Sequence, residues 1–418
     1  MRIAIIGTGI AGMTAAWLLH RNHELTVFEA AARIGGHINT VDVTTGGKVY
    51  AIDTGFIVFN DRTYPNFIRL LRELQVETQQ TAMSFSVRCD KTGLEYNGAS
   101  LNTLFAQRRN LLRPSFYRML RDILRFNREA PALLTADNHP LSLRDYLEQQ
   151  RYSREFIDHY LIPMGAAIWS AQPDLMGQIP AHYFVQFFHN HGLLSIDQRP
   201  QWQVIQGGSR RYAQRLVAPF RDRIRLACPV AWVRRLPDGV LIKPQDGEPE
   251  RFDALIIAVH SDQALRLLAD PSEQERTILG AIPYQENEVV LHTDTRLLPR
   301  RRLAWAAWNY HIPRQPQAPV ALTYNMNILQ ELNAPETFCV SLNHSAAIDP
   351  ARILYRTVYH HPVYTPDAVA ARQRWGEING VNRTWYCGAY WGYGFHEDGL
   401  NSALAVERQW QQEERWAA

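Results

Sequence analysis

The glycine-rich segment near the N-terminus has the spacing of a diphosphate-binding turn. Gly7, Gly9 and Gly12, with Ile10 and Ala11 inside the pattern, form GxGxxG. The first glycine permits a tight turn, the second lets backbone approach a diphosphate, and the third lets a helix pack on a strand. Glu29 follows about 20 residues later, where a carboxylate can accept hydrogen bonds from ribose hydroxyls. Together these residues predict a dinucleotide site rather than a chance cluster of glycines.

The residues around this motif predict the strand, turn and helix that the motif needs. Residues 3–6 are a continuous apolar run, as in a buried parallel strand, and residues 11–19 suit a helix. Residues 25–28 form a second predicted strand, which ends at Glu29. The helix N-terminus then faces the bound anion. We expect residues 30–60 to be rich in loops and residues 64–74 to be helical.

The continuation of the motif resembles the flavin-containing amine oxidoreductase superfamily. Residues 29–37 read EAAARIGGH, which is similar to the ExxxRxGG(R/H) pattern of that superfamily. The resemblance implies FAD as the cofactor, with Arg33, Gly35 and Gly36 lying against its diphosphate and flavin. Physically, an arginine can neutralise diphosphate charge, and paired glycines let a ring system press on backbone. His37 stands where the superfamily most often has an arginine.

Two further segments carry the same resemblance along the chain. Residues 228–259 look like the middle flavin segment, in which the backbone at Val230 is expected to hold the adenine end. Residues 386–403 resemble the segment that wraps the isoalloxazine, which brings in Gly388, Gly399 and Leu400. A helix that begins at Gly399 would direct its positive end at the flavin. Cys387 is interpreted as a buried small residue rather than a covalent flavin link.

These observations predict an α/β fold in two domains, as in amine oxidases. A Rossmann-type FAD-binding domain is expected from residues 1–75, 200–280 and 375–418, and it is interleaved with an α+β substrate domain. The substrate domain takes residues 76–199 and 281–374, as a mostly helical insertion plus a mixed sheet. We expect the strands within residues 203–259 to return to the first sheet. In the substrate domain, residues 288–292 and 303–309 are predicted strands.

The absence of a lysine from the second part of the chain argues against ordinary amine oxidation. Many amine oxidases of the superfamily use a lysine, linked by water to the flavin, and two tyrosines that sandwich the amine. This chain has no lysine after Lys243, and His396 stands at one of the tyrosine positions. We predict that His396 is catalytic, because an imidazole there can move a proton while a C–H bond delivers hydride to flavin N5. A structural histidine is the alternative.

Residues 53–60 and 305–310 resemble a bacterial branch of NAD/FAD-binding proteins associated with cyclopropane and furan fatty-acid synthesis. That resemblance implies oxidation of a hydrophobic substrate, namely a modified fatty acyl chain of a phospholipid, and a tunnel lined by Trp, Phe and Leu. Three alternatives stay open: an amine oxidase, a carotenoid-type desaturase, and a non-catalytic flavin-binding partner of a lipid methyltransferase.

Composition limits the other partners. The 418 residues carry 44 basic and 41 acidic side chains, and this excess is too small to indicate a nucleic-acid partner. The four cysteines lie far apart, which favours a reduced, cytoplasmic protein. Histidines pair at residues 189–191 and 360–361 without a carboxylate or cysteine at ligand spacing, so we expect no metal.

An anionic membrane surface is the one macromolecular partner that the sequence favours. Arginines recur at helical spacing beside an apolar side over residues 116–128. A helix of this kind can lie at the inner membrane face, and a packed surface helix is the alternative. The arginines concerned are Arg118, Arg121, Arg125 and Arg128.

Overall fold

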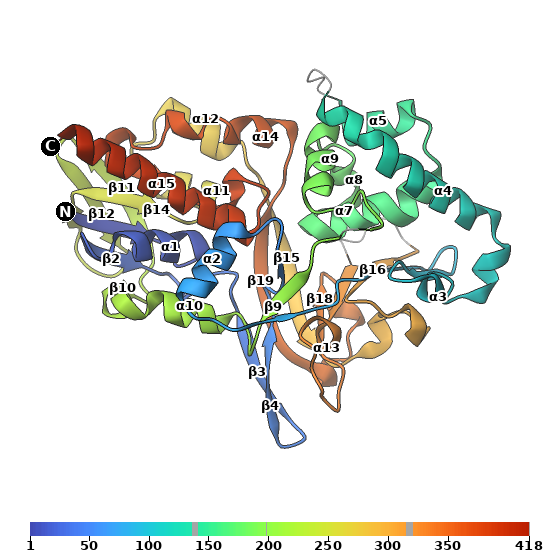
Figure 1. The fold of residues 1–418 in the computed structure, drawn as a ribbon. Coiled ribbons are helices and arrows are strands. Elements are labelled where there is room, and N and C mark those ends of the chain that lie inside the picture. The colour runs from blue at the N-terminus through green and yellow to red at the C-terminus, as the bar shows by residue number, and fades with distance from the viewer. Residues whose placement is uncertain (136–140, 198, 315–320, 418) are drawn as a thin grey trace.

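A computed structural model describes residues 1–135, 141–197, 199–314 and 321–417. Its first layer is a five-stranded parallel sheet whose strands come from distant parts of the chain (Figure 1). In spatial order the strands are β10 (Ile224–Arg225), β2 (Glu24–Phe28), β1 (Arg2–Ile6), β14 (Ala254–Ile257) and β20 (Thr384–Tyr386).

The apolar run of β1 is buried on both faces of this sheet. Ile3 and Ile5 belong to the core shared with the helices on one face, whereas Ala4 and Ile6 pack into the core on the other face, because side chains alternate along a strand. The first face is covered by α1 (Ile10–Leu19), α2 (Pro65–Glu73), α10 (Arg210–Val217) and α15 (His396–Ala417). The second is covered by β11 (Val230–Leu236), β12 (Gly239–Pro244), β13 (Glu250–Phe252), α11 (Ser261–Leu267) and α12 (Glu273–Gly280).

A seven-stranded mixed sheet forms the second layer. Its long strands β15 and β19 run between the two halves of the molecule in Figure 1. In spatial order it contains β19 (Ile353–Pro362), β15 (Tyr284–His292), β18 (Cys339–Leu342), β17 (Ala321–Asn325), β16 (Trp308–Ile312), β7 (Phe85–Cys89) and β8 (Leu94–Asn97).

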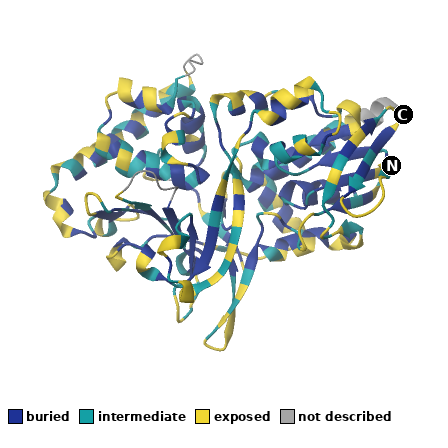
Figure 2. Cartoon of the chain, turned by 180° about the vertical axis from the view of Figure 1, so that it is seen from behind, coloured by how far each residue is buried: buried dark blue, intermediate teal, exposed yellow. Residues whose placement is uncertain are grey.

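The expected helical insertion packs against this second sheet, with a buried core beneath exposed outer faces (Figure 2). Its last helix ends at Asn190, within the range of residues 76–199 expected from the sequence. Its helices are α3 (Leu101–Leu104), α4 (Pro114–Glu129), α5 (Leu143–Gln149), α6 (Arg154–Phe156), α7 (Ile162–Trp169), α8 (Pro173–Met176) and α9 (Ala181–Asn190). Two short helices, α13 (Met326–Leu329) and α14 (Pro366–Arg372), lie elsewhere in the chain.

The shorter strands form two further small sheets, one of which is a hairpin that we did not expect. Residues 30–60 contain the hairpin β3 (Thr40–Thr45) and β4 (Lys48–Asp53), where we expected mainly loops. The turn between them is Gly46–Gly47, and both glycines have positive φ, as two-residue hairpin turns favour. A further small sheet joins β5 (Phe59–Asn60), β9 (Trp202–Ile205) and β6 (Thr78–Gln80).

Two other strand predictions need correction. The strands β11–β13 form a separate antiparallel sheet, and β14 alone among the predicted strands of residues 230–259 joins the parallel sheet. Short turns can join antiparallel strands, whereas parallel pairing needs a long crossover. Residues 303–309 are not one strand, because a 3₁₀ turn η6 (Arg302–Ala304) precedes β16. The Asn309 side chain stabilises this corner through the backbone N–H and carbonyl of Ala306.

The predicted fold class is confirmed: a parallel nucleotide-binding sheet interleaved with a mixed-sheet and helical part. The domain boundaries stay a prediction. In the described part of the chain, no helix has both the length and the apolar character needed to cross a bilayer.

Candidate active site

The glycine turn between β1 and α1 has two glycines that packing requires and one that faces open space. Gly7 has φ of +103°, and a Cβ added to it would lie 2.7 Å from the Ala258 carbonyl oxygen. A Cβ on Gly12 would lie 2.0 Å from the Gly7 oxygen, whereas a Cβ on Gly9 would meet nothing within 4 Å. The first turn of α1 has neither an acidic residue nor a side-chain cap. Its N–H groups and the open face of Gly9 therefore fit a diphosphate.

Glu29 is held beside this turn. Its Oε2 accepts the Thr8 N–H at 2.9 Å and the Thr8 hydroxyl, and its Oε1 accepts the Ala31 N–H at 2.8 Å. A carboxylate has about four acceptor positions, so capacity for further donors is left. Ribose binding by Glu29 stays a prediction, and the structure supplies the contacts that would orient the carboxylate for it.

Arg33 stabilises its own turn. Its guanidinium donates to the carbonyl oxygens of Ile38 at 3.0 Å and Gly36 at 2.9 Å, where we expected it to face the diphosphate. The turn uses left-handed backbone that favours glycine, because Gly35 has φ of +111° and Gly36 has φ of +56°. A Cβ on Gly36 would lie 3.4 Å from the Cα of Gly9. The paired glycines thus let this turn approach the glycine-rich motif.

His37 belongs to a cluster of imidazoles that sequence inspection missed. It stacks on Tyr359 with ring centroids 4.7 Å apart, and it lies 5.4 Å from His361 and 5.9 Å from His260. Burial, followed by the charges of His361 and His260, lowers the pKa of His37 well below 6.5. Its Nε2 is buried without a hydrogen-bond partner among the described residues. A buried, unpartnered nitrogen beside Gly36 is a further feature that fits an anionic cofactor.

The middle segment, residues 228–259, also lies next to the turn that holds Glu29. The Cys228 N–H donates to the Glu29 carbonyl oxygen at 2.8 Å, which sets the start of β11 against the end of β2. Val230, the first residue of β11, is half-buried there. The backbone of Val230 therefore stands on the Glu29 side of the turn, where we expect the adenine end of the cofactor.

The C-terminal segment also converges on α1. A Cβ on Gly399 would lie 2.7 Å from Ile10 Cγ2, Leu400 is buried in the core beneath α1, and the Gly388 N–H donates to the Ser402 hydroxyl at 2.8 Å. Tertiary folding thus gathers predicted cofactor residues from the two ends of the chain. Their contacts with a cofactor stay predictions.

Helix α15 begins at His396, three residues before the predicted start. The reason is Asp398, whose Oδ2 accepts the N–H of Phe395, the residue before the helix, at 2.9 Å, as the acidic residue of a capping box does. Burial raises the pKa of Asp398 to about 6. When ionised, this carboxylate offsets the positive end of the helix that we expected to face the flavin.

His396 is enclosed by aromatic rings. It stacks on Phe56 with ring centroids 3.5 Å apart, and its Nε2 lies 2.9 Å from the Tyr212 hydroxyl. Burial lowers the pKa of His396 to about 3, so the ring is neutral at pH 7. A neutral, hydrogen-bonded imidazole is a weak base, and this geometry favours a positioning role. Catalysis by His396 stays a prediction.

An aromatic cluster joins the C-terminal loop to the helical insertion. Tyr393 stacks on Tyr183 of α9 with ring centroids 4.7 Å apart, and Trp169 Nε1 donates to the Tyr393 carbonyl oxygen at 3.2 Å. The Arg372 guanidinium lies 4.4 Å from the Tyr183 ring and 5.1 Å from the Tyr393 ring. Tyr393 belongs to a run rich in Trp and Tyr over residues 385–395, which is visible in the sequence, whereas nothing in the sequence singles out Arg372.

A cavity of about 570 Å³ lies elsewhere, and it includes none of the predicted site residues. Its lining is largely polar and includes Gln79, Arg211 and Gln330. It is therefore not the apolar tunnel expected in the substrate domain, and that tunnel stays a prediction.

Comparisons with known proteins agree with this arrangement. The family model for flavin-containing amine oxidoreductase matches residues 10–315. Carotenoid phi-ring synthase from Streptomyces griseus is 26% identical over 298 residues, which cover 65% of this chain and 54% of that protein. The chain thus spans about half the length of this curated relative.

Two solved structures share the fold over nearly their whole length. Cyclohexylamine oxidase from Brevibacterium oxydans IH-35A has a TM-score of 0.70 at 16% identity and covers 98% of this chain and 99% of its own. The CLA-producing fatty acid isomerase from P. acnes has a TM-score of 0.69 at 16% identity and covers 97% of this chain and 98% of its own.

Proposed function

The chain belongs to the flavin-containing amine oxidoreductase family, with FAD as its cofactor, and from this premise we propose that it oxidises a hydrophobic substrate. The substrate we propose is a modified fatty acyl chain of a phospholipid. FAD, when bound, supplies an acceptor for hydride at flavin N5. The residues of the chain provide the binding site and exclude water.

The observation that carries the substrate class is the position of Arg372. Its guanidinium lies against the stacked rings of Tyr183 and Tyr393, 4.4 Å and 5.1 Å from their centroids, and donates to the Gly392 carbonyl oxygen at 2.5 Å. A positive charge at the aromatic cluster disfavours an ammonium substrate bound there, and the nearby Asp398 carboxylate, when ionised, offsets part of that charge. An uncharged chain is not repelled, and aromatic walls stabilise it by apolar burial at about 0.8 kcal/mol per CH₂.

The proposed FAD site rests on the residues that meet at the start of α1. The open face of Gly9 and the free N–H groups of the helix would hold the diphosphate, and Glu29 the ribose. His37 offers a buried nitrogen next to the same turn. None of these groups is an evident acid or base for the substrate, so their role is to bind and orient.

The names of two relatives agree with an apolar substrate. One is a carotenoid phi-ring synthase and the other a fatty acid isomerase. Cyclohexylamine oxidase represents the amine-oxidising alternative. The missing lysine and the position of Arg372 favour the first two substrate classes over the third.

Anaerobic titration of the FAD-loaded protein tests the proposal. Phospholipids that carry unsaturated, methyl-branched or cyclopropane acyl chains, and separately putrescine and cyclohexylamine, are added while flavin absorbance is recorded. We expect bleaching by an acyl lipid, and mass spectrometry should show its loss of two hydrogens. Bleaching by an amine alone would establish an amine oxidase. Bleaching by dithionite but by none of these substrates would favour a non-catalytic flavin-binding partner.

A further inference from the structure

One face of the helical insertion combines exposed leucines with arginines. Leu101 of α3 is 78% exposed and Leu112, at the end of the 3₁₀ turn η1 (Arg108–Leu112), is 88% exposed. Leu111, Tyr117 and Leu303 are exposed beside them. We call this the arginine–leucine face, and its cations are Arg108, Arg109, Arg300, Arg301 and Arg302.

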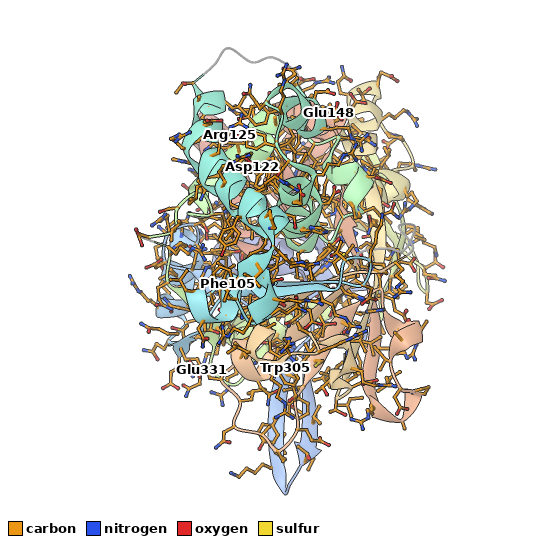
Figure 3. All side chains as sticks on the ribbon, turned by 90° about the vertical axis from the view of Figure 1, so that its right-hand side faces the viewer. Phe105, Asp122, Arg125, Glu148, Trp305 and Glu331 are labelled. Atoms are coloured by element: carbon orange, nitrogen blue, oxygen red, sulfur yellow. The ribbon has the colours of Figure 1, made fainter. Side chains whose placement is uncertain are left out.

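Two segments far apart in sequence form this face. Asn97, the last residue of β8, joins them, because its carbonyl oxygen accepts the Thr103 hydroxyl at 3.0 Å and its side-chain amide donates to the Trp305 carbonyl oxygen at 2.9 Å. Helix α3 accordingly packs against η6. Figure 3 views the molecule from this side, with Phe105 and Trp305 labelled.

One carboxylate reaches this face from below: the buried Glu95 accepts the backbone N–H groups of Arg300 and Arg301 at 3.1 and 3.2 Å, whereas the five guanidinium groups form no ion pair among the described residues. Arg108 donates to the carbonyl oxygens of Asn102 and Phe105, and Arg109 donates to that of Gly93. Within residues 101–128, all described by the structure, Asp122 is the one carboxylate and it is buried. Residues 299–305 contain no Asp or Glu. Five exposed arginines against one buried carboxylate leave this face with a net positive charge next to exposed apolar side chains.

The arginine stripe predicted from the sequence is different. Arg118 pairs with Glu155 at 2.5 Å, Arg125 pairs with Glu129 at 2.9 Å, and Arg128 with the same Glu129 at 3.1 Å. Most of the apolar side of α4 is not free, because Phe116, Met119 and Phe126 are buried in the core. The stripe is thus mainly a packed helix with paired charges, and the arginines without an ion pair among the described residues lie before it in the chain and at η6.

We propose that the arginine–leucine face docks on an anionic phospholipid bilayer. Guanidinium groups bind lipid phosphates in a bidentate manner, and the leucines and Tyr117 can enter the headgroup region. Two copies of this chain would not pair through this face, because arginines would oppose arginines. A nucleic acid would leave the leucines exposed to water. The proposal concerns location and holds whether or not the acyl chain is the substrate.

Vesicle co-sedimentation tests the proposal without any turnover. The FAD-loaded protein is mixed with phosphatidylcholine vesicles with and without one-third phosphatidylglycerol, at 50 mM and 500 mM NaCl. We expect binding to the anionic vesicles at low salt, and a loss of at least about tenfold in affinity at high salt. Binding to neither kind of vesicle, or equal binding at both salt concentrations, would overturn the proposal.

Two variants and one matched control locate the contact. One variant changes Arg108, Arg109 and Arg301 to Glu, and a second changes Leu101 and Leu112 to Asp. Each should weaken binding to the anionic vesicles by at least about tenfold. The control changes Arg21, Arg221 and Arg276 to Glu, which alters net charge equally in the nucleotide-binding half. Circular dichroism and FAD content should be unchanged in all three. Equal losses in the control and the face variants would overturn the proposal.

Two further outcomes would also overturn it. Light scattering that shows a dimer dissociated by the face variants would identify a self-association surface. Binding of single-stranded RNA with equal affinity, lost in the same variants, would identify a polyanion site. Because vesicle binding is measured without substrate oxidation, failure here leaves the proposed oxidation intact, and failure of the titration above leaves this proposal intact.

Discussion

His396 lies flat on Phe56, with ring centroids 3.5 Å apart and ring planes inclined by 11°. Phe56 comes from the loop after β4 and His396 from the first turn of α15, so this stack ties the C-terminal helix to the N-terminal part of the chain. The Tyr212 hydroxyl, 2.9 Å from His396 Nε2, adds a third segment to the same contact. The imidazole is therefore a candidate active-site group that also holds three segments of the chain together.

The first prediction concerns the pH dependence of stability at His396. Because the folded pKa is about 3, below the usual value of about 6.5, the unfolded chain binds more protons between those values. The contribution of the neutral ring to stability is full above about pH 6.5 and falls as pH decreases toward 3.

His396→Phe keeps a ring on Phe56 and removes this titration. Urea unfolding at pH 7 and pH 4.5 should show a smaller loss of stability in the variant than in the wild type. Equal losses would mean that His396 does not titrate as described. An unchanged rate of flavin reduction by the acyl substrate in the same variant, at normal FAD content, would exclude proton transfer by His396.

The second prediction is that Gly12 is needed for folding and Gly9 for FAD binding. Gly12→Ala places a methyl group 2.0 Å from the Gly7 oxygen, so it should destabilise the fold by at least about 1–3 kcal/mol. Gly9→Trp meets open space at its Cβ and keeps an extended backbone, so the protein should fold. It should nevertheless purify without FAD, because the indole blocks the diphosphate position. Thermal unfolding and flavin absorbance measure the two effects, and a yellow Gly9→Trp protein would contradict the cofactor site.

The third prediction concerns His37 and cofactor affinity. The pKa of His37 lies well below 6.5 in the protein alone, and an adjacent diphosphate would raise it. Binding of FAD should then take up a proton, so the apoprotein should bind FAD more tightly at pH 6 than at pH 8. His260, His361, His396, Arg33 and Tyr359 are the other titratable groups that face His37.

Variants of His37 make this test specific. His37→Phe should bind FAD with little dependence on pH, and His37→Arg should bind at pH 8 at least as tightly as the wild type does at pH 6. Calorimetry in buffers of different ionisation enthalpy counts the proton directly. If the wild type takes up no proton, His37 does not contact the diphosphate.

The fourth prediction concerns Arg372. Arg372→Met keeps an unbranched apolar stem against Tyr183 and Tyr393 and removes the donor to the Gly392 oxygen. FAD content should stay normal, whereas flavin reduction by the acyl substrate should slow by about tenfold as the 389–395 loop loses its anchor. Repulsion of amines should also weaken, so cyclohexylamine should bleach the variant faster than the wild type. Arg372→Lys is the control, because it retains the charge. An unchanged amine rate in Arg372→Met would remove the charge argument for the substrate class.

The sequence determined the cofactor motif and the elements that surround it. Gly7, Gly9 and Gly12 could be interpreted one by one because the demands on them are local: a positive φ, a close helix–strand contact and an open approach. The apolar run of β1 likewise predicted a strand buried on both faces. The Gly46–Gly47 hairpin also had a local signal, in two adjacent glycines between β-type residues, although we expected a loop there.

Only the tertiary structure decided which side chains meet. His37, His260 and His361 come from a loop, a helix cap and a strand, and no spacing in the chain predicts their approach. The same holds for Arg372, which lies against two stacked tyrosines, and for Glu155, which neutralises Arg118 from another helix. Helical periodicity identifies a charged face, but the charge that remains depends on partners brought by distant segments. Local conformational preferences depend on neighbouring residues, whereas pairing between distant side chains depends on the packing of the whole chain.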